Sequence, residues 1–333
     1  MRVAFIGVSH WHLPLYLDPV LTAPDVTVVG VADPHLPAAE RAAAQAACPA
    51  FADWREMLDR VRPDFVFVLG RHCDMADTAR HLIAARVPFA IEKPAGLNGA
   101  EVAALAEAAD AAGAFAAVPF VFRQSSWFDA IRETAARERV LYAGFKFVAG
   151  SNARYRAAGC DWMLHRATAG GGCMLNLGIH FLDLAAALFD APPVVAGATM
   201  SNARDGLDVE DHAAVLLRAG AGACMIETGY LYPAPHMAFD MHISIRTERH
   251  YFAAKDADGM EIRDDGGASR FLPCGMTNVP WYPGFVRDVL RRAERGAKPV
   301  AGLQQMREAM ALLDDAYRIA PLAGASRNDA SSS

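Results

Sequence analysis

PFAIEKP, residues 88–94, is a short apolar run that stops at an acid, a lysine and a proline. Residues 89–91 are typical of a buried parallel strand, and open α/β sheets bind ligands just beyond the carboxyl ends of such strands. Lys93 is therefore expected where chemistry takes place. Pro94 restricts Lys93 to extended backbone angles, so its neighbour Glu92 is expected to point to the opposite side. A lysine at a strand end can also be plain surface, unless a second polar segment meets it.

The strand at residues 89–91 belongs to a regular alternation of strands and helices in the first third of the chain. Each apolar, often β-branched run is followed by a helical stretch, which is typical of a parallel, doubly wound sheet of the Rossmann type. We therefore expect an α/β domain over residues 1–122. The other strands are expected near residues 3–7, 26–32, 65–69 and 115–118.

The pattern changes after residue 122. Longer runs, several alternating apolar and polar, follow one another with short turns and predict a large, mainly antiparallel sheet. We expect an α+β domain over residues 123–322 and a flexible tail over residues 323–333. The strands are expected near residues 141–149, 193–200, 212–217, 223–230 and 239–245.

Composition narrows the class of ligand. The chain has 333 residues, 53% of them hydrophobic, and a net charge of -6 without a long basic run. This argues against nucleic acid and anionic membrane and favours a small-molecule ligand. The six cysteines are scattered, as is usual for reduced thiols in a cytoplasm, and the chain begins without room for a signal peptide. No apolar run is expected to span a bilayer, so a cytoplasmic protein is predicted.

Residues 7–12, Gly-Val-Ser-His-Trp-His, occupy the first turn from strand to helix, where a dinucleotide fold places its phosphate-binding glycines. Gly7 can supply the tight turn. Ser9 and His12, however, stand where further glycines are usual. His10 and His12 lack a third metal ligand nearby in sequence, so no metal site is expected.

Asp33 ends the second strand, where an acid would hydrogen-bond the adenosine ribose of a dinucleotide. A carboxylate at this place repels the 2′-phosphate of NADP, which favours NAD over NADP. The alternative is that Asp33 caps a turn before Pro34.

The second polar segment is residues 170–183, in which a triple glycine leads into an apolar helix. Asn176 and His180 are four residues apart and share a helical face, and Asp183 is placed to orient the imidazole. A histidine on such a helix is otherwise a satisfied core residue. The glycines favour a site because they let another backbone or a ligand approach.

A linking helix is expected near residues 125–139, and several residues between the start of the second domain and the triple glycine are candidates for substrate contact. Aromatic groups beside hydrogen-bonding groups suit a polyhydroxylated ring, which has apolar faces and polar edges. The alternative places Trp162 in the core and the arginines in solvent. The candidates are Arg123, Arg154, Tyr155, Trp162, His165 and Arg166.

Taken together, these motifs resemble the Gfo/Idh/MocA family of nicotinamide-dependent oxidoreductases over nearly the whole chain. The resemblance rests on Gly7, Asp33, residues 92–94, the glycine stretch that ends in His180, and residues 210–211. It implies an NAD- or NADP-binding first domain and a second domain that contacts substrate and forms a homodimer or homotetramer through its sheet. The cofactor contacts it implies are Gly7, Ser9, His10, Trp11, Asp33, Leu69, Gly70, His72, Glu92 and Lys93.

The chain departs from the family pattern at three places. Asn176 stands where many members carry aspartate, Ser9 and His12 replace glycines, and residues 70–73 replace a customary Thr-Pro-Asn loop. Asn176 cannot act as a base, although it can hydrogen-bond a substrate hydroxyl.

The expected reaction is hydride transfer between the nicotinamide and a secondary alcohol or carbonyl of a sugar, cyclitol or related polyol. His180 is expected to act as base or acid, Lys93 to hold the substrate oxygen, and Asn176 to fix the substrate between them. One alternative is a glycoside hydrolase that uses NAD for transient oxidation. Another is a catalytically silent protein that binds NAD or a sugar.

Overall fold

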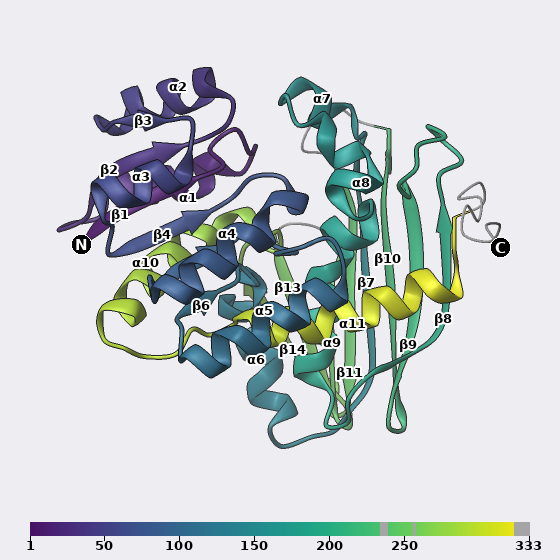
Figure 1. Cartoon of the computed structure of the whole chain (residues 1–333). Coiled ribbons are helices and arrows are strands. Elements are labelled where there is room, and N and C mark those ends of the chain that lie inside the picture. Colours follow the sequence, from purple (N-terminus) through teal and green to yellow (C-terminus); the bar gives the residue numbers. More distant parts are fainter. Residues whose placement is uncertain (234–238, 256–257, 323–333) are drawn as a thin grey trace.

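The structure is a computed structural model that describes residues 1–233, 239–255 and 258–322. Two β-sheets lie side by side in it, one of six strands and one of eight (Figure 1). The predicted Rossmann-type domain followed by an α+β domain is thereby confirmed. The tail predicted over residues 323–333 lies outside the described residues.

The first sheet is parallel throughout, in the order β3-β2-β1-β4-β5-β6. Its strands are apolar runs because helices pack on both faces and leave two separate cores. The strand order reverses between β1 and β4, which is where such sheets bind ligands. The strands are β1 (Arg2–Ile6), β2 (Thr27–Ala32), β3 (Ala50–Phe51), β4 (Phe65–Val68), β5 (Phe89–Ile91) and β6 (Ala116–Ala117), and the helices are α1 (Leu13–Leu21), α2 (Leu36–Ala46), α3 (Trp54–Val61), α4 (His72–Ala85) and α5 (Gly99–Ala112).

Helix α10 (Tyr282–Glu294) packs against α1, although it lies far along the chain within residues 123–322. The rings of Tyr282 and Phe285 lie 5.2 and 6.3 Å from that of Tyr16. The chain therefore returns to complete one core of the first sheet. This packing also positions residues 277–280, the turn before α10, where they line the cavity between the two domains.

The second sheet is mixed, in the order β14-β13-β12-β11-β7-β10-β9-β8. Only β7 and β10 pair in parallel among its strands, so the prediction of a mainly antiparallel sheet is confirmed. The strands are β7 (Val140–Gly150), β8 (Val194–Ser201), β9 (His212–Ala219), β10 (Gly222–Tyr232), β11 (Phe239–Thr247), β12 (His250–Ala254), β13 (Gly259–Asp264) and β14 (Ser269–Pro273). The accompanying helices are α6 (Ser126–Ala135), α7 (Ala153–Ala157), α8 (Arg166–Ala169), α9 (Ile179–Leu188) and α11 (Leu303–Ile319).

One face of the second sheet is covered by α9, and α11 packs against both α9 and α5 of the first domain (Figure 1). The rings of Phe145 on β7 and Phe181 on α9 stack at 5.0 Å. Residues Arg166–Leu188 are long and apolar enough to cross a membrane, contrary to the expectation from sequence, but 83% of the apolar window is buried inside the protein. A core helix meets the same criterion, because burial against a sheet also requires apolar side chains all round.

The opposite face of the second sheet carries exposed apolar side chains. Leu216 on β9 and Met225 on β10 face each other across the ladder, with 46% and 52% of their surfaces exposed. Phe271 on β14 is exposed as well. The expectation of a homodimer or homotetramer through this sheet stays a prediction.

The turn after β1 requires a close approach between the backbones of Gly7 and Gly70, and this requirement can be tested. Gly7 has φ +76°, and a Cβ there would lie 2.5 Å from the backbone nitrogen of Gly70. Gly159 has a similar φ of +70° but no heavy atom within 4 Å of the added Cβ. We predict that Gly159→Ala lowers the free energy of unfolding by about 1–2 kcal/mol, the cost of the backbone conformation alone. Gly7→Ala should cost about 1–3 kcal/mol more because of the clash. Urea denaturation measures both, and equal losses would show that the close approach of Gly7 and Gly70 is not a constraint.

Candidate functional site

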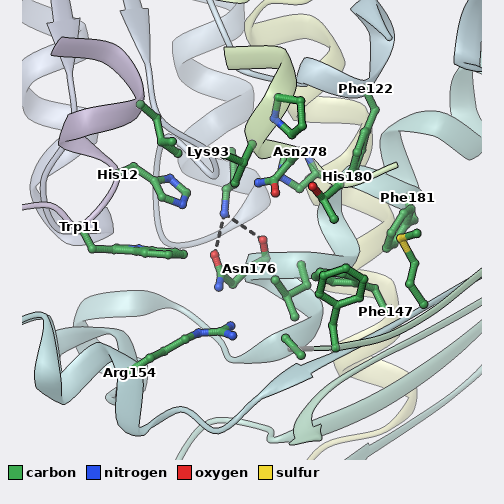
Figure 2. Close-up of a pocket in the computed structure, with 18 of the residues that line it drawn as sticks. Trp11, His12, Lys93, Phe122, Phe147, Arg154, Asn176, His180, Phe181 and Asn278 are labelled. Atoms are coloured by element: carbon green, nitrogen blue, oxygen red, sulfur yellow. Dashed lines mark hydrogen bonds between the residues drawn. The ribbon is translucent and has the colours of Figure 1, made fainter. Parts of the chain in front are cut away.

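Lys93 reaches from the carboxyl end of β5 to the second domain. Its Nζ donates hydrogen bonds to Oδ1 of Asn176 at 2.6 Å and to the backbone oxygen of Asn176 at 2.8 Å (Figure 2). The two distant polar segments of the sequence therefore meet, as their pairing predicted. Lys93 is only 3% exposed, so it is not plain surface.

The pKa of Lys93 lies close to physiological pH. Burial lowers the pKa of its ammonium to about 8, Glu92 opposes this shift, and Arg154 adds to it. Removing an ammonium from water disfavours its charged form unless carboxylates compensate. The two acceptors that Asn176 provides are neutral. Lys93 can therefore exchange a proton within the physiological range.

Asn176 is held in one orientation. It lies in a π-helix, Met174–Gly178, and its Nδ2 donates to the hydroxyls of Tyr155 at 2.6 Å and Tyr230 at 3.1 Å. Because an ammonium is donor-only, Oδ1 must be the amide atom that faces Lys93. Tyr155 in turn accepts from Nη2 of Arg154 at 2.9 Å. The Asn176 side chain is thus fixed from both ends.

Glu210 anchors the segment that carries Asn176. Its carboxylate accepts from the backbone N–H groups of Gly172 and Met174, both at 2.9 Å, and from the hydroxyl of Tyr317 at 2.8 Å. A Cβ on Gly172 would collide with the backbone oxygen of Glu210, so the glycine is required for this approach. Sequence reasoning had noted Glu210 only as part of a resemblance. The signal that it acts on this turn is long-range and is not visible in the local sequence.

His180 lines the same cavity but has a different environment. Its two ring nitrogens are buried and have no hydrogen-bond partner among the described residues, and the rings of Phe120 and Phe122 flank it at 5.9 and 5.5 Å. Burial first, and then the positive charge of Lys93, lower the pKa of His180 to about 3. The imidazole is therefore neutral at physiological pH, with unused hydrogen-bonding capacity.

Asp183 does not orient His180, contrary to the expectation from spacing. Both of its oxygens accept from Arg123, Nε and Nη2, at 2.8 Å each. Burial raises the pKa of Asp183 to about 6, although Arg123 opposes the shift. Arg123, expected as a substrate contact, is committed to this ion pair and lies outside the lining of the cavity.

Oε2 of Glu92 accepts from the backbone N–H of Lys93 at 3.1 Å, and the carboxylate also organises a buried network with His12. Oε1 of Glu92 lies 2.7 Å from Nδ1 of His12 and accepts from the hydroxyl of Tyr16 at 2.6 Å. Burial acts to raise the pKa of Glu92, but His12 and Lys93 outweigh it and hold that pKa well below its usual range. Since a carboxylate accepts only, Nδ1 of His12 carries the proton, which leaves Nε2 as an acceptor. Sequence reasoning had considered His12 as a missing glycine and, with His10, as an incomplete metal pair, but not as a partner of Glu92.

The crevice that the sequence predicted to bind a dinucleotide is framed by Gly7, Gly70 and Asp33. The Asp33 carboxylate accepts from the backbone N–H groups of Ser9 at 2.7 Å and His35 at 2.8 Å. Asp33 therefore does cap a turn, as the alternative reading held, and it also remains at the end of β2, where a ribose would lie.

Two histidines and a tryptophan join the domains beside this crevice. The ring of Trp162 lies 4.9 Å from His72 and 5.7 Å from His10, and Nδ1 of His72 donates to the backbone oxygen of Ala169 at 2.7 Å. Burial lowers the pKa of His72 to about 4. These contacts pack the turn after β1 and the start of α4 against the second domain.

The cavity between the domains has a volume of about 460 Å³. Of the candidates named from sequence, five line it: Trp11, Lys93, Arg154, Asn176 and His180. Tyr155 lies behind Asn176, Leu69 is buried beneath the crevice, and His165 and Arg166 are exposed.

Comparison with known proteins places this chain in a family. Residues 1–120 match the family described as oxidoreductase family, NAD-binding Rossmann fold, and residues 145–250 match the GFO/IDH/MocA C-terminal domain. These matches cover more than half of the chain. The chain belongs to the Gfo/Idh/MocA family of NAD(P)-dependent oxidoreductases, as the resemblance of its motifs predicted. No curated protein matches it.

Solved structures share the fold at low sequence identity. GenD2 from gentamicin A biosynthesis, in complex with NAD, is 21% identical, with a TM-score of 0.80 over 96% of this chain and 93% of that one. Levoglucosan dehydrogenase, in complex with NADH and levoglucosan, is 16% identical, with a TM-score of 0.81 over 96% and 97%. A 3-ketoreductase from Actinomadura kijaniata, in complex with NADP and TDP-benzene, is 16% identical, with a TM-score of 0.80 over 97% and 98%.

The contact between Lys93 and Asn176 predicts a measurable titration. NMR of lysine side chains labelled with carbon-13 should show Lys93 titrating near pH 8, where its pKa lies. Asn176→Asp should raise this pKa, because a carboxylate would replace an amide oxygen 2.6 Å from Nζ.

The matched control is Asn98→Asp, which makes the same charge change at the exposed cap of α5, a position where aspartate also serves. It should leave the titration of Lys93 unchanged. A wild-type midpoint near the ordinary lysine value of 10.5 would contradict the burial and pairing described above.

Proposed function

We propose that this protein transfers a hydride between a nicotinamide cofactor and a secondary alcohol or carbonyl, with Lys93 as the acid and base. The proposal rests on the buried Nζ of Lys93. Lys93 lines the cavity, and its Nζ donates hydrogen bonds to two oxygens of Asn176. An oxidoreductase of this kind needs a group that exchanges the hydroxyl proton while the cofactor exchanges the hydride.

The crevice at the end of β1 is the proposed site of the dinucleotide. A Cβ on Gly7 would meet the backbone of Gly70, so the turn is built for a close backbone approach at the point where the strand order reverses. Gly7, Ser9, Gly70 and Asp33 are the residues that would hold the cofactor. When bound, its nicotinamide supplies the hydride acceptor or donor.

Lys93 is better suited than His180 to move the proton. An ammonium has three hydrogens, and the two acceptors on Asn176 leave one for a substrate oxygen. In the direction of oxidation the neutral amine accepts the hydroxyl proton, and in the direction of reduction the ammonium returns it. His180, with a pKa of about 3, is a weak base, so we assign it the role of a neutral hydrogen-bond partner for the same oxygen.

The reacting carbon is proposed to be a ring carbon that bears a hydroxyl or carbonyl group. The solved structure of levoglucosan dehydrogenase in complex with NADH and levoglucosan supports a cyclic substrate within this fold. A sugar, cyclitol or polyol was the substrate class expected from sequence.

Asp33 supports NAD as the preferred cofactor. Its carboxylate would lie beside the adenosine ribose and would repel an added 2′-phosphate. Solved proteins of the same fold carry NAD in one case and NADP in another, so the fold alone does not select between them.

The two alternative functions predict different results when cofactor is added. A hydrolase that oxidises its substrate transiently would show no net reduction of added NAD, whereas a binding protein would bind NADH and reduce no carbonyl. Both would be distinguished from a dehydrogenase by absorbance at the NADH band during turnover.

Replacing Lys93 should separate chemistry from cofactor binding. Lys93→Met keeps the apolar stem and removes the proton carrier, so kcat should fall by about 10²–10³-fold or more. NADH affinity, measured by fluorescence, should stay within a few-fold of wild type. Lys146→Met on β7, where the lysine pairs with Asp240, is the control and should keep full activity. An active Lys93→Met enzyme would remove Lys93 from the mechanism.

Replacing Asp33 should change cofactor choice. Asp33→Asn keeps a hydrogen-bonding oxygen but removes the negative charge, so the ratio of kcat/KM for NAD over NADP should fall about tenfold or more. Asp59→Asn makes the same charge change on the exposed face of α3 and should leave the ratio unaltered. An unchanged ratio in Asp33→Asn would show that Asp33 serves only as the turn cap.

A further inference from the structure

We propose that the substrate carries its reacting hydroxyl or carbonyl on an apolar ring, and that this cavity selects against polyhydroxylated rings. The inference rests on the proposed function, and it narrows the substrate class of the same site. It departs from the sugar or polyol expected from sequence, because the side chains that line the cavity away from Lys93 are apolar.

The apolar wall is built by the paired ends of β7 and β11. Phe147 stands opposite Met241, and Ala149 stands opposite Phe239, in the antiparallel register of these strands. The remaining apolar lining comes from helices and turns around them. It consists of Pro14, Leu15, Phe122, Leu177, Phe181, Val279 and Pro280.

Polar side chains are unevenly distributed around the cavity, and among them His180 and Asn278 lie beside the phenylalanines. In Figure 2, His12, Trp11 and Arg154 lie on one side of Lys93 and Asn176, while Phe122, Phe147 and Phe181 lie on the other. A ligand bound with its oxygen at Lys93 therefore places the rest of its body against aromatic and aliphatic side chains. That arrangement fits a molecule that is polar at one point and apolar elsewhere.

Much of the polar capacity around Lys93 is already used. Oδ1 and the backbone oxygen of Asn176 accept from Lys93, and its Nδ2 donates to Tyr155 and Tyr230. Arg154 donates to the hydroxyl of Tyr155 and to the backbone oxygen of Gly150. Lys93 and His180 remain for one reacting oxygen. The other polar lining residues are His12, Thr277 and Asn278, and the lining residues Trp11 and Arg154 each keep one nitrogen, Nε1 and Nε, without a hydrogen-bond partner among the described residues.

A polyol would therefore lose hydrogen bonds to water without recovering them along the wall. Each buried hydroxyl left without a partner lowers affinity by about tenfold or more. An unsubstituted ring gains affinity from the same wall, since its surface is removed from water against carbon.

The test compares two alcohols with the same six-membered carbon ring. Cyclohexanol carries one hydroxyl, and myo-inositol carries one on every carbon. We measure kcat/KM for each with NAD, and we measure the affinity of cyclohexanone and myo-inositol for the NADH-bound protein by calorimetry. The expected result is a kcat/KM at least about 100-fold higher for cyclohexanol, with cyclohexanone binding more tightly than the polyol.

The outcomes separate this inference from the proposed function. Faster oxidation or tighter binding of myo-inositol overturns the apolar-substrate proposal and leaves the dehydrogenase intact. Preferential binding of cyclohexanone without oxidation of cyclohexanol supports the inference and contradicts the proposed reaction. Binding of neither ring overturns the inference.

Two variants test the wall itself. Phe147→Ser and Met241→Gln should each weaken cyclohexanone binding about tenfold or more, while NADH affinity stays within about twofold. Phe271→Ser, at a phenylalanine that is 59% exposed on β14, is the matched control and should bind like wild type. An equal loss of NADH affinity in the wall variants would assign this surface to the cofactor instead, and it would overturn the proposal.

Discussion

A single buried ammonium group joins the two domains of this protein. Lys93 leaves the first sheet at the end of β5 and places Nζ on the side-chain and backbone oxygens of Asn176 in the second domain. Burial disfavours the charged form of the lysine, and hydrogen bonds to neutral acceptors offset this only in part. The pKa of Lys93 therefore falls to about 8. The same contact that holds the cleft together thus prepares its lysine for proton exchange.

Two carboxylates support this contact from opposite sides without touching Nζ. Glu92 engages His12 and Tyr16, while Glu210 binds the backbone at Gly172 and Met174 and so fixes the turn that presents Asn176. A carboxylate in direct contact with Nζ would restore the ordinary pKa of the lysine. The charges are therefore arranged so that the structure is anchored while the ammonium stays easy to deprotonate.

The sequence predicted the fold and the meeting of its two polar segments, because strand periodicity and the spacing of glycines are local signals. It did not predict which side chains pair with one another inside the site. Asp183 lies one helical turn from His180, yet it pairs with Arg123, since a guanidinium from a neighbouring segment matches both carboxylate oxygens. His12 and the apolar wall at Phe147 and Met241 depend on side chains far apart in sequence, so only the folded chain brings them to one cavity.

The pH dependence of a single turnover tests the role of Lys93 most directly. In this experiment the protein with bound NAD is mixed with a secondary alcohol that it oxidises. If Lys93 is the base, the rate of NAD reduction is low while the ammonium is charged and rises with pH to a plateau, with a midpoint near the pKa of about 8. The rate of the reverse reaction falls through the same midpoint. A rate of oxidation that does not change between about pH 6 and 10, while a deuterium isotope effect shows that hydride transfer limits it, would contradict the assignment of Lys93 as the proton carrier.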